Sequence, residues 1–129
     1  MANFPDNLRY TKEHEWVRLD GKCAFVGVTD YATEQLGDVV HLDLPEVDAE
    51  FEKEAACAVI ESVKSVSDIY VPVSGKIVEI NETVTDNPAI INEDPYGEGW
   101  LFKVEMTDPG EVDGLMSAAA YQKFLADES

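Results

Sequence analysis

"ESVKSVSDIYVPVSG", residues 61–75, sets one lysine, Lys64, between two runs that are typical of β-strands. The apolar run "ACAVIESV" (56–63) precedes the lysine, and β-branched and aromatic residues follow it. Ile69, Val71 and Val73 are predicted to share one buried face, because side chains along a strand alternate between its two faces. Lys64 is therefore predicted to lie at the tip of a β-hairpin.

A second hairpin is predicted near the N-terminus. Asp20-Gly21 separates the strand-like residues 15–19 and 22–28. Glycine tolerates the positive φ that a two-residue hairpin turn needs. The pattern therefore predicts two antiparallel strands on either side of this turn.

Residues 29–38 are predicted to form a short helix. Thr29 or Asp30 suits its N-cap, because a short polar side chain accepts a hydrogen bond from a free N–H of the first turn. Gly37 suits the position just past its end, where helices often turn into a left-handed conformation.

The remaining strands follow from alternation of apolar and polar residues. They are predicted at residues 39–44, 76–80 and 100–106. The residues expected on their buried faces are Val40, Leu42 and Leu44 in the first, and Trp100, Phe102, Val104 and Met106 in the last.

The other segments are turn-rich or helical. Residues 81–99 contain several turn signals and are predicted to be a loop wrapped over the surface. Asp108-Pro109 suits the start of one helical turn, and Ser117 suits the cap of a C-terminal helix over residues 118–126. Short strands, one internal helix and a helical tail predict a mainly β sandwich or barrel, in one domain spanning residues 1–129.

The charge of the chain excludes several classes of partner. Asp and Glu number 27 against 9 Lys and Arg, a formal net charge of −18. A phosphate backbone or an anionic lipid surface would repel such a protein, so we expect neither nucleic-acid nor membrane binding. The N-terminal residues lack the pattern of a secretory signal or a transit peptide, which makes the cytoplasm the expected location.

The cysteines and histidines are too dispersed for a disulfide framework or a metal site. Cys23 and Cys57 lie in apolar, strand-like runs, where a free cysteine usually acts as a small buried hydrophobe. His14 and His41 lack the close spacing of zinc ligands. We therefore expect buried thiols and no metal.

No catalytic constellation stands out. The sequence "GEG" at 97–99 lacks the lysine and the spacing of a phosphate-binding loop, and there is no G-x-S-x-G elbow. The acidic pairs are numerous only because the chain is acidic, so a pair such as that in "NEDP" is more typical of a capped turn. The sequence thus favours a non-catalytic protein over an autonomous enzyme, with no catalytic residues assigned.

Two interpretations of Lys64 remain open from the residues alone. One is an ordinary solvated surface lysine. The other is a site of covalent modification, because small or compact neighbours leave the amine open and no acidic residue lies within two positions.

Four blocks of this sequence resemble one family. They are "YTKEHEWV" (10–17), "GVTDYATEQLGDVVHLDLPEV" (27–47), "ESVKSVSDIYVPVSGKIVEIN" (61–81) and "INEDPYGEGWLFKVE" (91–105). In this order they closely resemble the H protein of the glycine cleavage system. One departure is Asp48, which stands where many members carry glycine.

The resemblance implies a lipoyl/biotinyl-carrier-like flattened barrel of two small antiparallel sheets, with an acceptor lysine at a hairpin tip. The lysine of the matching "ESVKS" is Lys64, which by resemblance carries lipoic acid through an amide bond. The long lysyl-lipoyl arm would carry an aminomethyl group between active sites, and tethering keeps that group at a high effective concentration.

The resemblance also implies the partners. They are a pyridoxal-phosphate glycine decarboxylase, a tetrahydrofolate-dependent aminomethyltransferase and a dihydrolipoamide dehydrogenase that uses FAD and NAD. A lipoate ligase or an octanoyltransferase would modify the lysine. Lipoate would be the only cofactor of the chain itself, and the chain is expected to be a monomer.

Two carboxylates are implied for a cleft that holds the loaded arm. Glu15 is the glutamate of the matching "HEW", and Asp68 is the aspartate of the matching "SVSD". A carboxylate suits a site for a protonated aminomethyl group. Each also has a plain interpretation, Glu15 as a solvated strand residue and Asp68 as a turn residue.

Other members of the carrier class fit less well. Biotinyl domains typically set the lysine between methionines, and dehydrogenase lipoyl domains usually have Asp-Lys-Ala, whereas this chain has "SVKSV". A donor of lipoyl groups to other lipoyl enzymes and an unmodified, non-catalytic β-domain that serves as a binding module remain as alternatives.

Overall fold

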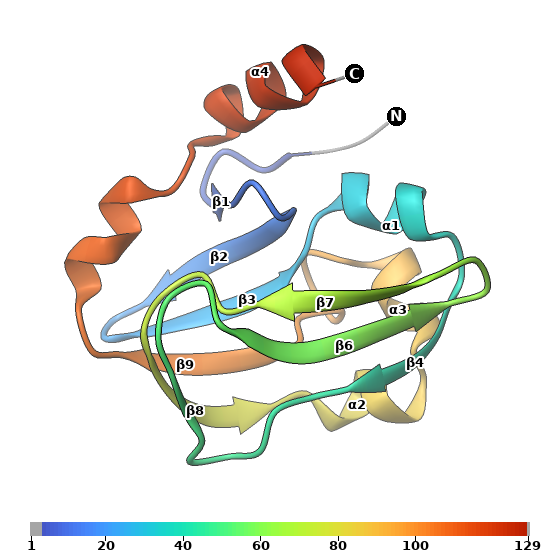
Figure 1. The fold of residues 1–129 in the computed structure, drawn as a ribbon, viewed down its shortest axis with the longest axis horizontal. Helices are drawn as coiled ribbons and strands as arrows, with labels where there is room; N and C mark the ends of the chain where they lie inside the picture. The colour runs from blue at the N-terminus through green and yellow to red at the C-terminus, as the bar shows by residue number, and fades with distance from the viewer. Residues whose placement is uncertain (1–3, 129) are drawn as a thin grey trace.

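The computed structural model describes residues 4–128, which form two antiparallel sheets (Figure 1). The larger sheet has the order β1 (Arg9–Tyr10), β2 (Glu15–Asp20), β3 (Cys23–Val28), β9 (Phe102–Met106), β8 (Gly75–Ile80) and β5 (Glu50–Phe51). The smaller has the order β4 (Val39–Asp43), β6 (Ala56–Ser62) and β7 (Val66–Tyr70). The mainly β, flattened-barrel prediction is confirmed, and the two sheets do not close into one cylinder.

Both sheets contribute to one apolar core. Val26 and Val104 of the larger sheet and Ile60 and Ile69 of the smaller are all nearly inaccessible to solvent. The alternation of side chains along the strands therefore predicted the buried faces correctly for most positions. Val71 and Val73 are buried as predicted, but they lie after β7 ends, and Pro72 between them is buried as well.

Val40 is an exception, because 54% of its surface is exposed. The pairing of β4 with β6 shifts register between Val39 and His41, and this β-bulge changes which side chains face inward. Val39 is buried in place of Val40, and Leu42 is buried as predicted. The predicted buried face of this strand was wrong at its start.

The local turn and cap predictions are confirmed. Gly21 has φ 62° in the β2–β3 turn. Helix α1 (Asp30–Leu36) is capped by Thr29, whose Oγ1 accepts from the N–H of Ala32, and Gly37 ends it with φ 77°. Asp48 also has positive φ, 77°, which explains why glycine suits this position in the family that the sequence resembles.

The segment 81–99 is not the loop that was predicted. It contains two short helices, α2 (Glu82–Asp86) and α3 (Ala89–Glu93). Val84 and Ile91 are fully buried and anchor one helix each to the core. Helices this short gain their stability from packing, so their own sequence carries little helical signal.

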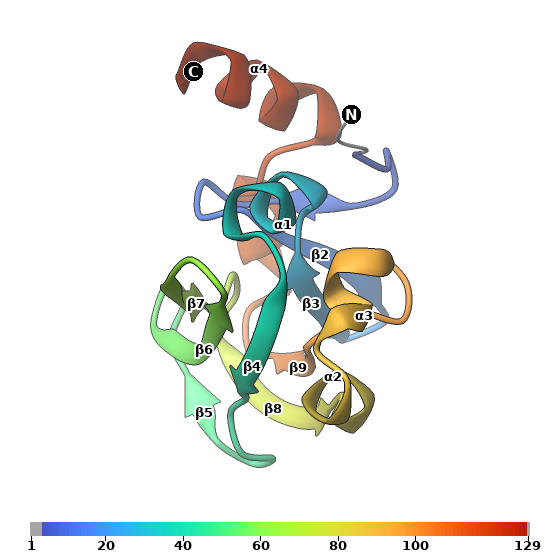
Figure 2. The same cartoon turned by 90° about the vertical axis from the view of Figure 1, so that its right-hand side faces the viewer.

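The C-terminal tail closes a second, smaller core. The 3₁₀-helix η1 (Pro109–Gly114) is capped by Asp108, and α4 (Ala118–Glu128) starts after Ser117, as predicted. The ring of Tyr121 stacks on Tyr10 with centroids 4.8 Å apart. Figure 2 shows α4 lying beside the N-terminal segment and away from the smaller sheet. None of the described helices is long and apolar enough to cross a membrane.

Candidate functional site

Lys64 lies where the sequence predicted it, in the turn that joins β6 to β7 (Figure 1). The Ser62 N–H donates to the Ser65 carbonyl at 2.8 Å and closes the turn. The Ser62 hydroxyl oxygen accepts from the N–H groups of Lys64 and Ser65 at 3.2 and 3.1 Å. Local hydrogen bonds thus satisfy the turn backbone, and the Lys64 side chain is left exposed.

No carboxylate among the described residues forms a salt bridge with Lys64. Two valines near the lysine are also exposed, Val63 at 67% and Val66 at 62%. The Lys64 amine is therefore exposed between two exposed valines, and a modifying enzyme can reach it.

Glu15 is buried rather than solvated, with 1% of its surface exposed. It begins β2 after a short loop in which His14 has φ 71°. The Thr11 hydroxyl oxygen accepts from the N–H groups of Glu13 and Glu15, which fixes the loop. The plain interpretation of Glu15 as a solvated strand residue is thereby wrong.

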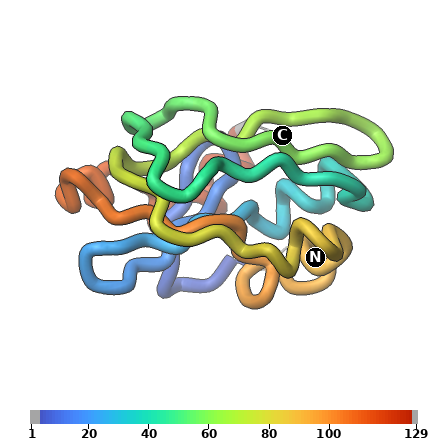
Figure 3. Tube along the Cα trace, turned by 90° about the horizontal axis from the view of Figure 1, so that it is seen from below, coloured from blue at the N-terminus to red at the C-terminus, as the bar shows by residue number. Residues whose placement is uncertain are grey.

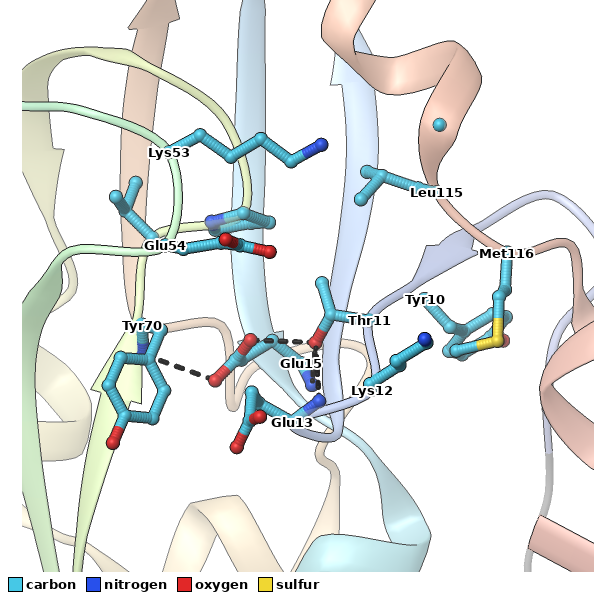
Figure 4. Close-up of a pocket in the computed structure, with 13 residues that line it drawn as sticks. Tyr10, Thr11, Lys12, Glu13, Glu15, Lys53, Glu54, Tyr70, Leu115 and Met116 are labelled. Atoms are coloured by element: carbon cyan, nitrogen blue, oxygen red, sulfur yellow. Dashed lines mark hydrogen bonds between the residues drawn. The ribbon is translucent and has the colours of Figure 1, made fainter. Parts of the chain in front are cut away.

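Two donors hold the Glu15 carboxylate. The Thr11 hydroxyl donates to Oε1 at 2.7 Å, and the Tyr70 N–H donates to Oε2 at 3.1 Å (Figure 4). Burial raises the pKa of Glu15 to about 7, although both hydrogen bonds oppose the shift. The carboxyl group thus titrates near neutral pH.

Glu15 lines a cavity of about 490 Å³. Its walls come from the β1–β2 loop, the segment before β6, the end of β7 and the turn before α4 (Figure 4). Its lining residues are Tyr10, Thr11, Lys12, Glu13, Glu15, Lys53, Glu54, Tyr70, Val71, Pro72, Gly114, Leu115 and Met116. Three carboxyl groups line the cavity against the two lysines Lys12 and Lys53, and with the aromatic and apolar side chains this lining suits a cationic group attached to an apolar chain.

Asp68 does not line this cavity. It is exposed on β7 and borders a smaller hollow of about 190 Å³, together with Cys57. The structure therefore does not bring the two predicted carboxylates together, and only Glu15 is enclosed. Asp68 lies on the strand that leads from Lys64 to Tyr70.

Cys23 and Cys57 are both free thiols, each partly buried. The Cys57 thiol donates to the Ile69 carbonyl at 3.5 Å. Burial, followed by the nearby Glu15, raises the pKa of Cys57 to about 12. The thiol stays protonated at neutral pH, which makes it a poor nucleophile. In the described part of the chain, no group of three or more His, Cys, Asp or Glu side chains is arranged to hold a metal ion.

The sequence did not identify the residues that complete the cavity. Tyr70 contributes a main-chain N–H, which no residue type reveals, and Thr11 acts through its spacing of four from Glu15. Tyr121 also was not singled out. Its hydroxyl lies 2.8 Å from His14 Nδ1 and 2.9 Å from Thr29 Oγ1, which ties the tail to the loop before Glu15.

Comparisons with known proteins identify the family of this chain. The sequence profile of the family described as "Glycine cleavage H-protein" matches residues 8–128. The glycine cleavage system H protein of Thermotoga maritima is 56% identical over 120 residues, which are 93% of this chain and 97% of that protein. The H protein of Symbiobacterium thermophilum is 52% identical over 124 residues, which are 96% and 97% of the two chains.

A solved structure is also similar. The crystal structure of a glycine cleavage system H protein from Mycobacterium marinum superposes with a TM-score of 0.88 at 40% sequence identity. The match covers 95% of this chain and 99% of that one. The chain therefore belongs to the glycine cleavage H-protein family, the non-catalytic lipoyl carriers of the glycine cleavage system.

Proposed function

We propose that Lys64 is the residue that carries the lipoyl group, through an amide bond to its Nζ. The observation that supports this most directly is an exposed lysine, without a salt bridge among the described residues, in the β6–β7 turn. The residues present fit the group, because an exposed amine at a chain reversal admits an enzyme active site from several directions. When bound, the lipoyl group supplies a disulfide that accepts an aminomethyl group and later yields it.

The smaller sheet gives the attachment point a suitable position. A lysine side chain extended by an eight-carbon acyl chain is ~15 Å long. The five residues of β7 span a similar length, since a strand rises ~3.3 Å per residue. Tyr70, which lines the Glu15 cavity, ends β7 six residues after Lys64, ~20 Å along an extended strand, so the arm would reach most of the way to the cavity.

Glu15 is proposed to recognise a cationic amine in that cavity. An ionised carboxylate in a buried site attracts a positive charge more strongly than one in water, because little solvent screens the interaction. The Tyr70 N–H and the Thr11 hydroxyl orient both carboxylate oxygens. The apolar side chains of Leu115 and Met116 would exclude water from the other side.

Asp68 is proposed to contribute from outside the cavity. It is exposed, so solvent screens its charge and its attraction for a cation is weaker than that of Glu15. We therefore expect Glu15 to dominate recognition and Asp68 to add a minor effect along the path.

The partners proposed for this carrier are the other enzymes of the system. They are glycine decarboxylase with pyridoxal phosphate, aminomethyltransferase with tetrahydrofolate, and dihydrolipoamide dehydrogenase with FAD and NAD. A lipoate ligase or an octanoyltransferase would attach the group. We propose that the chain meets each of them as a monomer.

Mass spectrometry of the intact protein tests the attachment. Protein made in cells that synthesise lipoate is expected to gain one lipoyl increment, mapped to Lys64 by proteolysis. Lys64→Ala should remove the increment, whereas the control Lys76→Ala, an exposed lysine on β8, should keep it. An unmodified wild-type chain, or an increment on another lysine, would contradict the proposal.

The rate at which the aminomethyl group is released tests the cavity. Glu15→Gln in the loaded protein should speed release of the group to solvent as formaldehyde and ammonia. Asp68→Asn should have a smaller effect, and Glu79→Gln, an exposed glutamate on β8 that does not line the cavity, serves as the control for a lost charge. Equal release rates in the wild type and Glu15→Gln would remove Glu15 from this role.

A further inference from the structure

The segment 37–39, which joins α1 to β4, contacts the turn that presents Lys64. The Asp38 carbonyl accepts from the Val63 N–H at 3.0 Å, so the residue directly before Lys64 is bonded to this segment. Figure 3 shows the hairpin tip lying beside the same stretch of chain.

Gly37 lies under the Lys64 side chain. A Cβ placed on Gly37 would come within 3.0 Å of Lys64 Cε and 3.9 Å of Val63 Cγ2. Gly37 also has φ 77°, a conformation that side chains disfavour. The backbone conformation therefore favours glycine here, and the chain passes close to the stem of the exposed Lys64 side chain.

Asn92 holds this segment from the other side. Its Oδ1 accepts from the Val39 N–H at 2.9 Å, and its Nδ2 donates to the Gly37 carbonyl at 2.8 Å. A carboxamide is suited to this bridge because it offers a donor and an acceptor at once, whereas a carboxylate offers only acceptors. Helix α3, which was predicted to be part of a loop, supplies the residue.

We propose that Asn92 and Gly37 are positioning residues for acylation of Lys64. Asn92 fixes the backbone on both sides of Asp38, Asp38 fixes the Val63 N–H beside the lysine, and Gly37 lets the chain pass close to the lysine stem. The enzyme that modifies the lysine then meets an amine whose direction is restricted before binding. This inference rests on the proposed lipoylation of Lys64.

The consequence is kinetic. Misplacing a reacting group by about 1 Å can cost up to ~100-fold in rate even when binding is intact. Loosening the segment should therefore lower kcat for acylation and leave KM close to its wild-type value, because the surface that docks is unchanged. A residue that only stabilised the fold would not produce this separation at a temperature where the variant is fully folded.

The test is lipoylation of the purified apo protein by a lipoate ligase with lipoate and ATP, followed by mass spectrometry. Asn92→Asp is isosteric, keeps the acceptor for Val39 and loses the donor to Gly37. We expect kcat to fall about tenfold and KM to change less than twofold. Gly37→Ala leaves Asn92 intact but disfavours the φ of 77° at residue 37. This variant should also lower kcat, because it disturbs the same segment.

Asn87→Asp is the matched control. Asn87 is exposed between α2 and α3, and its main-chain N–H, which the substitution keeps, bonds to the Thr83 carbonyl. Asn87→Asp introduces the same negative charge as Asn92→Asp in the neighbouring helical segment. This variant should be lipoylated at the wild-type rate. Hydrogen exchange of the Val63 amide gives a second reading, and Asn92→Asp should speed it at least several-fold.

Three results would overturn the inference, and they are distinguishable. If folded Asn92→Asp and Gly37→Ala are lipoylated at the wild-type rate, the positioning role is wrong and the attachment to Lys64 stands. If the wild type itself accepts no lipoyl group at Lys64, the proposed function is wrong, and the positioning role that rests on it is wrong as well. A fall in kcat for Asn87→Asp equal to that for Asn92→Asp would assign the effect to charge and also overturn the inference.

Discussion

Lys64 and Glu15 are charged groups in opposite environments. Lys64 is exposed at a turn, and its side chain has no salt-bridge partner among the described residues. Glu15 is 1% exposed and is held by the Thr11 hydroxyl and the Tyr70 N–H. An amine that other proteins must reach benefits from solvent, whereas a carboxylate that must distinguish a cation benefits from burial. The difference suggests that the electrostatic cost to stability lies at Glu15.

The pKa of Glu15 gives that cost a pH dependence. Its usual value near 4.5 is raised to about 7 in the folded chain, mainly by burial. Between these two pH values the folded state binds more protons than the unfolded state. The free energy of unfolding should therefore fall as pH rises from about 4.5 to about 7, and stay low above that range.

The largest expected effect is that of Glu15→Gln on this pH dependence. Glutamine keeps the shape and an acceptor for the Tyr70 N–H but cannot ionise. Relative to the wild type, the variant should gain roughly 2 to 3 kcal/mol in unfolding free energy between pH 5 and pH 8. Urea unfolding at several pH values measures this difference, and Glu79→Gln, at an exposed glutamate on β8, should show little of it. Parallel curves for the wild type and Glu15→Gln would refute the burial argument.

The second effect is that of Thr11→Val, which removes one of the two donors to Glu15. The hydroxyl also accepts from the N–H groups of Glu13 and Glu15, so its loss should cost about 1 to 2 kcal/mol. Because its hydrogen bond lowers the pKa of Glu15, the variant should titrate Glu15 at a higher pH. Carbon-13 NMR of the carboxyl group measures this pKa, and Thr11→Ser should restore both properties. A lower pKa in Thr11→Val would contradict the geometry.

The two groups also differ in how far the sequence predicts them. The position of Lys64 follows from local pattern, since the alternation on both sides of the lysine and the small residues at the turn are neighbours in sequence. The caps of α1 at Thr29 and Gly37 follow for the same reason. Such features depend on a few adjacent residues, so a single sequence carries their full signal.

The burial of Glu15 does not follow from local pattern. Its partner at Tyr70 is 55 positions away and contributes only a backbone N–H. The resemblance to the H-protein family singled out Glu15 and Asp68 together, yet Asp68 is exposed and borders a different hollow. The bulge that exposes Val40 likewise arises from pairing with β6. These features depend on how distant strands meet.

A smaller effect is expected from Tyr121→Phe, which tests whether the tail supports the loop before Glu15. The ring can keep its stack on Tyr10, but the bonds of its hydroxyl with His14 and Thr29 are lost. We expect a loss of about 1 kcal/mol in unfolding free energy and faster exchange of the Glu15 amide hydrogen. The hydrogen exchange of Val63, beside Lys64, serves as the internal control and should not change. Equal acceleration at both amides would mean that the tail supports the whole fold rather than this loop.

The smallest effect on stability is expected from Lys64→Gln. The Lys64 side chain is exposed, and the hydrogen bonds of the turn come from the Ser62 hydroxyl and the main chain, which the substitution leaves in place. The urea midpoint should therefore match that of the wild type from pH 5 to pH 8, although the lipoyl group would be lost completely. Lys64→Gln and Glu15→Gln each remove one charge. Urea unfolding of both variants over the same pH range therefore shows whether the change in stability depends on the burial of the charged group or only on the loss of a charge. A clear shift of the midpoint in Lys64→Gln would mean that the lysine is already engaged with the folded surface before it is acylated, and the contrast between the open amine and the buried carboxylate would fail.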